Sequence, residues 1–198
     1  MGYILERVRQ YIEISNALEI VRRYFVINAF DGAVTILGAV MGAYISGINT
    51  PKALINMGFS VSIALAMSGF TGSLLMELAE RGGEVKELEK RLFRKLDNSL
   101  ITEAHNFASL VAALVDALSP AVVALTATIP FILAYMGIMV MADAFKASIL
   151  ITLTFTALLG FYLGRISKTR VWLYTAAMVG AGLLTAALSL MLEGAFHS

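Results

Sequence analysis

Apolar residues gather in five long stretches of this chain, and short connections that carry most of the charges separate them. Within the stretches the apolar positions follow a helical period and do not alternate with polar ones, as they would in a membrane β-barrel. About 20 helical residues cross the roughly 30 Å hydrocarbon core of a bilayer, and each stretch approaches or exceeds that length. The pattern predicts an all-α integral membrane protein with five transmembrane helices, at residues 24–46, 53–76, 106–140, 147–164 and 171–192.

The same pattern divides the chain into four regions. Residues 1–23 place apolar side chains on one helical face, which predicts an amphipathic helix at the cytoplasmic membrane surface. Residues 24–76 hold the first two spans, residues 77–105 form a short charged helical segment, and residues 106–198 hold the last three spans. The first 23 residues carry charges throughout and contain no apolar signal core, so we expect no cleavable signal peptide.

Composition narrows the class of protein. Hydrophobic residues make up 59% of the 198 residues and charged residues only 15%, against about 45–50% and about 25% in ordinary soluble domains. The absence of cysteine excludes disulfides, thiolate metal sites and a cysteine nucleophile. The net charge of +1 gives no basic footprint of the kind that nucleic-acid-binding proteins carry. These values indicate a membrane protein that does not bind nucleic acid.

The basic residues predict the orientation in the membrane. Thirteen of the 15 Lys and Arg residues lie before the first stretch, between the second and third, or between the fourth and fifth. Only Lys52 and Lys146 fall in the other connections. Because basic connections stay in the cytoplasm, the N-terminus is expected inside and the C-terminus outside. In a prokaryote the membrane would be the cytoplasmic membrane.

Two carboxylates, Asp31 and Asp116, lie inside the predicted spans. A carboxylate in a bilayer costs at least about 2.5–3.5 kcal/mol unless it faces protein or water. Asn28 and Thr35 lie three residues before and four residues after Asp31, so the three share a helical face. Glycines at positions 38 and 42 extend this face and would allow another helix to approach closely.

The third span carries a second polar stripe. Its members are Ser109, Asp116, Ser119, Thr126 and Pro130. Pro120 and Pro130 each remove a backbone donor and so free a carbonyl oxygen of the helix. Carboxylate, hydroxyl and carbonyl oxygens suit divalent cations or protons. The alternative is that each Asp is protonated or caps a neighbouring helix and only determines packing.

Met67 offers a softer ligand in the second span, close to Ser68, Thr71 and Gly72. A thioether favours a transition metal over Mg²⁺ or Ca²⁺. The alternative is simple packing, which is the common use of Met in apolar helices.

The charged segment contains a possible metal-capture cluster. Glu77, Glu80, Glu84 and Glu87 fall on one face if the second helix continues into this segment. Glu103 and His105, just before the third span, could join them, and a bound cation would relieve the repulsion between like charges. The alternative is a solvated helix whose Glu residues pair with Lys86, Lys90, Arg91 and Arg94. Gly82-Gly83 would weaken such a helix.

Enzyme motifs are missing from the sequence. It contains no GxSxG, HExxH, Walker A or dinucleotide-binding pattern, and its two histidines are His105 and His197. The flanks of Asp31 and Asp116 do not resemble those of intramembrane aspartyl proteases. We therefore expect a protein that is not an enzyme and has no tightly bound cofactor.

Three runs carry a resemblance to a known family. Residues 28–35, with Gly38 and Gly42, resemble the first helix of the vacuolar iron transporter family, in which an Asp-Gly pair opens a glycine-spaced helix. Residues 66–72 and 128–131 are similar to its second-helix and third-helix signatures, and the layout matches over most of residues 22–192. The order here is Met-Ser rather than Ser-Met, and Ser73 stands where the family has a carboxylate.

The resemblance implies a homodimer whose ion path lies between the subunits and is lined by their first helices. It implies export of Fe²⁺ or Mn²⁺ from the cytoplasm in exchange for protons. Asp31 and Met67 would be pathway residues, and the acidic segment would stand where the family has a cytoplasmic metal-binding domain. Two other hypotheses are a membrane scaffold or assembly protein that transports nothing, and a passive channel for monovalent cations.

Overall fold

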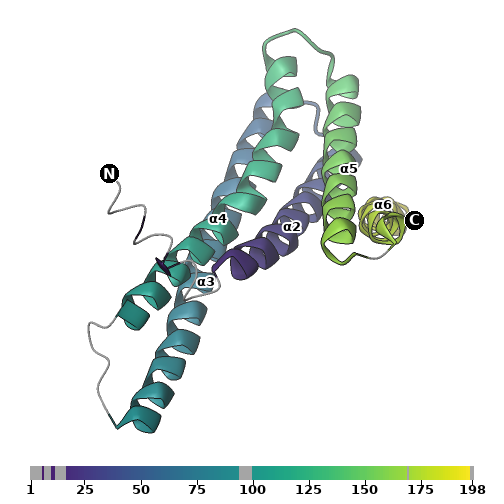
Figure 1. The fold of residues 1–198 in the computed structure, drawn as a ribbon. Coiled ribbons are helices and arrows are strands. Elements are labelled where there is room, and N and C mark those ends of the chain that lie inside the picture. Colours follow the sequence, from purple (N-terminus) through teal and green to yellow (C-terminus); the bar gives the residue numbers. More distant parts are fainter. Residues whose placement is uncertain (1–5, 7–9, 12–16, 94–99, 169, 197–198) are drawn as a thin grey trace. The chain divides into compact units, whose positions relative to one another are not determined.

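The computed structural model describes residues 6, 10–11, 17–93, 100–168 and 170–196 (Figure 1). Residues 17–93, 100–168 and 170–196 hold five α-helices, and the described residues contain no strand. The helices are α2 (Ala17–Ile45), α3 (Pro51–Leu92), α4 (Leu100–Tyr135), α5 (Met141–Ile166) and α6 (Val171–Phe196). All five of these described helices are long and apolar enough to cross a membrane. The predicted all-α fold with five membrane-length helices is therefore confirmed for this part of the chain.

Several helix boundaries differ from those expected. Helix α2 begins at Ala17 rather than at residue 24, and α3 continues through Gly82 and Gly83 to Leu92. Helix α4 ends at Tyr135 rather than at residue 140, and α5 begins at Met141 rather than at residue 147. Hydropathy marks the stretch that matches the bilayer, whereas backbone hydrogen bonds carry a helix beyond it. The rest of the predicted surface helix, at 1–5, 7–9 and 12–16, lies outside the described residues.

Two of the connections between helices have the same backbone structure. After α2 the N–H groups of Gly47 and Ile48 donate to the carbonyls of Tyr44 and Ala43, at 3.1 and 3.0 Å. After α4 the N–H of Gly137 donates to Ala134 in the same way, at 3.1 Å. Both glycines have positive φ, 66° and 76°. This is the Schellman ending of a helix, and it explains why both helices end two residues before a glycine.

The described residues belong to two compact units. The first comprises Met1–Phe25 and Ala66–Leu118, and the second comprises Val26–Leu65 and Ser119–Ser198. Helices α2, α3 and α4 each contribute residues to both units, whereas α5 and α6 belong to the second. The first unit therefore holds the charged part of α3, and the second holds Asp31.

An aromatic cluster forms part of the core of the second unit. Phe131 of α4 and Phe145 of α5 are buried and meet edge to face, with ring centroids 5.2 Å apart. Tyr44 of α2 meets Phe145 in the same way at 5.3 Å. Ile36 and Leu54 belong to the same apolar core. Aromatic rings favour this edge-to-face geometry, so the three rings join α2, α4 and α5 by specific packing.

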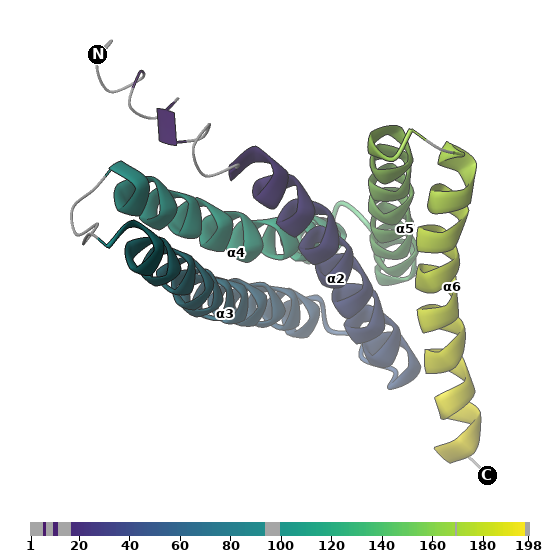
Figure 2. The same cartoon turned by 60° about the horizontal axis from the view of Figure 1, so that its bottom comes forward.

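Small residues allow α5 and α6 to lie side by side (Figure 2). Helix α5 buries an evenly spaced stripe, which is Ser148, Thr152, Thr156, Gly160 and Gly164. A Cβ atom added at Gly160 would lie 2.6 Å from the Cα of Thr175 in α6, so only a hydrogen fits there. Close backbone contact of this kind is a common way for helices to associate in lipid.

Candidate functional site

Helix α2 has one face in the core of the second unit and one face exposed. Ala33, Ile36 and Leu37 are almost fully buried. Asp31 and Thr35 are exposed in the single chain. Asn28 is half-buried on the same side of the helix.

The exposed face of α2 continues past Thr35 to the end of the helix. A Cβ atom added at Gly42 would meet no other atom within 4 Å, and Ser46 beyond it is exposed. Gly38 lies between Thr35 and Gly42 and is partly covered by Thr185 of α6, 3.8 Å from a Cβ atom added at Gly38. We call Asp31, Thr35, Gly38, Gly42 and Ser46 the α2 stripe.

Asp31 lies within the apolar part of α2, which begins after Arg22 and Arg23. It is the middle residue of α2, which runs from Ala17 to Ile45. A carboxylate facing lipid there would cost at least about 2.5–3.5 kcal/mol. The α2 stripe therefore requires either a protein surface or an aqueous path against it.

Met67 lies on an exposed face of α3 in the first unit. Its side chain is 62% exposed, and Ser68, Thr71 and Gly72 beside it are exposed too. Met67 is therefore not a core-packing residue of the single chain.

Asp116, in contrast to Asp31, is only 8% exposed. A Cβ atom at Gly69 would lie 2.8 Å from the Asp116 carbonyl oxygen, so the α3 backbone approaches that oxygen closely. Pro120 supplies no N–H to this carbonyl, which agrees with the predicted break in the helical ladder. The hydroxyls of Ser109 and Thr126 donate to carbonyls four residues earlier on α4, at 3.0 and 2.7 Å. These two hydroxyls thus bond within their own helix.

The charged part of the first unit contains a buried ion pair. Glu77 is 3% exposed and accepts a hydrogen bond from Arg81 Nε at 2.9 Å. Its other oxygen accepts from the hydroxyl of Tyr24 at 3.0 Å. The network joins α2 to α3 within the unit. The spacing of four residues could have identified Arg81, whereas no feature of the sequence pointed to Tyr24.

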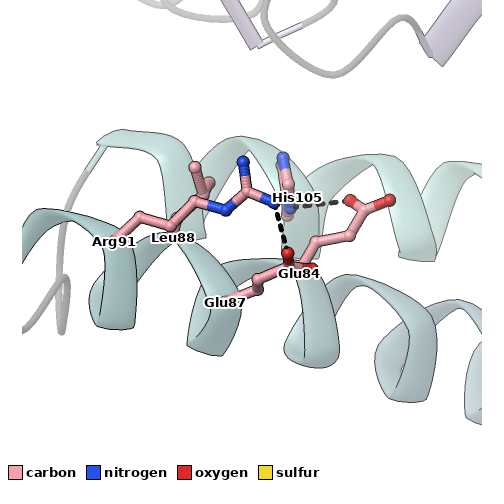
Figure 3. Close-up of a pocket in the computed structure, with 5 residues that line it drawn as sticks. All are labelled: Glu84, Glu87, Leu88, Arg91 and His105. Atoms are coloured by element: carbon pink, nitrogen blue, oxygen red, sulfur yellow. Dashed lines mark hydrogen bonds and ion pairs between the residues drawn. The ribbon is translucent and has the colours of Figure 1, made fainter.

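Glu84, Glu87 and His105 line an open cavity of about 280 Å³ between α3 and α4, together with Leu88 and Arg91 (Figure 3). Arg91 donates to Glu87 Oε1 at 2.6 Å, and Glu84 Oε2 lies 3.9 Å from His105 Nδ1. The Nδ1 atom is buried and has no hydrogen-bond partner among the described residues. This cavity is the part of the predicted acidic cluster where carboxylates and the imidazole do meet.

The other predicted members of the cluster are directed elsewhere. Glu77 is bonded to Arg81, Glu103 accepts from the hydroxyl of Tyr11 at 2.6 Å, and Glu80 is exposed. Within the described part of the chain, no three His, Asp or Glu side chains gather in a way that could hold a metal ion. Two of these carboxylates, Glu77 and Glu87, have an arginine four residues later, Arg81 and Arg91. The Glu87–Arg91 pair matches the alternative of a solvated helix.

The fold and these sites define a multi-pass membrane protein with a carboxylate on the exposed face of a membrane-length helix. No protein-family model matches the chain, and no solved structure matches it significantly. The uncharacterized protein MJ0645 of Methanocaldococcus jannaschii is 30% identical over 177 residues, which cover 88% of this chain and 89% of that protein. The chain belongs to the family of MJ0645.

Proposed function

We propose that this protein is a divalent transition-metal transporter that exports Fe²⁺ or Mn²⁺ from the cytoplasm in exchange for protons. The observation that carries the proposal is the exposed position of Asp31 at the middle of α2. An ionisable group at membrane depth indicates an ion or proton path by default. The resemblance of residues 28–35 to the vacuolar iron transporter family supports a metal ion as the substrate.

In this proposal a second copy of the chain covers the α2 stripe. A twofold interface brings the same surface of both subunits together, so two copies of Asp31 and Thr35 would face each other. The small residues at 38 and 42 would let the helices approach closely. One chain offers too few ligands for a metal on this face, and a dimer doubles them. Met67, on α3, is proposed separately as a pathway residue, because a thioether would favour a transition metal over Mg²⁺.

The charge distribution supports an orientation in which the acidic cavity faces the cytoplasm, and export is what the family resemblance implies. Thirteen of the 15 basic residues lie in the connections assigned to the cytoplasm by the positive-inside rule, so the N-terminus is inside. The cavity lined by Glu84, Glu87 and His105 would then lie on the cytoplasmic side. Its carboxylates, with the exposed Glu80, would raise the local concentration of a divalent cation before it enters the path.

Flux measurements on proteoliposomes test the proposal. Fe²⁺ or Mn²⁺ flux is expected to need the protein. The flux should increase when a proton gradient drives protons in the direction opposite to the metal, because protons are exchanged for the metal. K⁺ serves as the monovalent control and is expected to cross no faster than in empty liposomes. Conductance of K⁺ without metal flux would instead identify a passive channel. No flux of any ion through a folded dimer would identify a scaffold.

Cysteine crosslinking tests the dimer separately from transport. The chain has no cysteine, so Thr35→Cys and Ser46→Cys each introduce a single thiol on the α2 stripe. Mild oxidation in the membrane is expected to link one or both variants into dimers, because a twofold contact brings equivalent positions together. Leu158→Cys is the matched control, since this side chain is 59% exposed on α5. Linkage of the α5 control but of neither α2 variant would contradict the proposed interface.

A further inference from the structure

The connection between α5 and α6 concentrates positive charge that nothing in the described structure neutralises. Arg165, Lys168 and Arg170 are exposed there. The sequence has no Asp or Glu between Asp143 and Glu193. Among the described residues, none of these three basic side chains takes part in an ion pair. The charge is therefore available to an external anion.

The charges border an open cavity of about 640 Å³ that is also partly apolar. It is lined by Lys168, Arg170, Leu173 and Tyr174. Leu173 is half exposed, and Trp172 beside it is exposed as well. A free inorganic anion would leave these apolar groups in water. A ligand that carries both an anionic head and a hydrocarbon tail would cover both kinds of surface.

In a membrane crossed by both α5 and α6, the cavity would lie at the level of the lipid headgroups. Helices α5 and α6 are both of membrane length, and the cavity lies where one ends and the other begins. Trp and Tyr favour this boundary between hydrocarbon and water. The guanidinium of Arg165 lies over the ring of Phe161, 5.4 Å from its centroid, which holds a third positive charge beside the helix end.

We propose that the α5–α6 connection binds the phosphate headgroup of an anionic membrane lipid. Arg170 would donate two parallel hydrogen bonds to the phosphate oxygens, and Lys168 would add a point charge. Leu173 and Trp172 would contact the beginning of the acyl chains. Basic pockets between membrane helices bind anionic headgroups by this combination of contacts. The site is separate from the α2 stripe and does not depend on metal transport.

Native mass spectrometry of the full-length protein in a neutral detergent tests this site with two lipid probes, phosphatidylglycerol and phosphatidylcholine. The wild type is expected to retain phosphatidylglycerol more tightly. The double variant Lys168→Gln/Arg170→Gln is expected to bind it about 25-fold more weakly, and each single variant about fivefold, at about 1 kcal/mol for each basic residue. Lys146→Gln is the matched control, because Lys146 is already paired with Asp143 at 3.2 Å. This control should bind like the wild type.

The remaining measurements separate a lipid from a free anion and from loss of fold. Inorganic phosphate at millimolar concentration is expected not to displace phosphatidylglycerol, because it cannot occupy the apolar part of the cavity. Full displacement would overturn the lipid assignment. The lipid assignment would also be overturned if the wild type retained both lipids equally. The same holds if the double variant and both single variants bound phosphatidylglycerol as tightly as the wild type. Unchanged circular dichroism in the single variants keeps the comparison valid if the double variant folds poorly.

Discussion

Asp31→Ala is expected to reduce metal flux in proteoliposomes to the level of protein-free vesicles. The substitution removes the only carboxylate on the α2 stripe, and two copies of this group would provide the charged ligands of the proposed path. Without them, a dehydrated divalent cation would meet no negative charge on the α2 stripe, within an apolar span where an uncompensated charge is costly. Initial rates of Mn²⁺ uptake, measured at equal protein density, give the comparison.

Two variants control this experiment. Asp31→Asn keeps the size and hydrogen-bonding capacity of the side chain but removes its charge, so it is expected to fail in transport while the dimer persists. Asp143→Asn removes an exposed carboxylate in the first turn of α5 and is expected to transport like the wild type. Light scattering of the purified variants verifies the dimer. Equal flux in the wild type and Asp31→Ala would remove Asp31 from the mechanism.

Glu77→Ala is expected to lower the free energy of unfolding by about 3–5 kcal/mol. The variant would leave Arg81, whose side chain is 9% exposed, buried without its anion. It would also remove the acceptor of the Tyr24 hydroxyl. An uncompensated buried charge costs far more than the net contribution of the original pair. Unfolding in mixed micelles, followed by circular dichroism, measures the loss.

The matched control for Glu77 lies on the same helix. Glu87→Ala breaks another pair of the same spacing, but the side chains of Glu87 and Arg91 are 65% and 74% exposed. Its removal is therefore expected to cost no more than about 0.5 kcal/mol. The double variant Glu77→Leu/Arg81→Met should recover most of the lost stability, because it removes both charges together. Similar losses of unfolding free energy in Glu77→Ala and Glu87→Ala would show that burial of the Glu77–Arg81 pair does not affect stability.

The sequence alone determined the five membrane-length helices and much of the candidate chemistry. Apolar stretches of this length cannot be buried by so small a chain in water, and lipid leaves them only the helical conformation. The helical period also placed Asn28, Asp31 and Thr35 on one side of α2. Helix ends were less predictable, because the glycine-terminated turns after α2 and α4 depend on backbone hydrogen bonds, which hydropathy does not register.

Only the tertiary structure decided which polar groups are exposed and which are enclosed. Asp31 and Asp116 look alike in sequence, each a lone carboxylate in an apolar span. Packing leaves the first on an open helix face and encloses the second. In the sequence Glu77 resembles three other carboxylates of the same helical face. It is buried, because α2 packs against α3 there and the hydroxyl of Tyr24 donates to it. Whether a polar residue is buried depends on the side chains of the neighbouring helix. The periodicity of one helix does not reveal which helix packs against it.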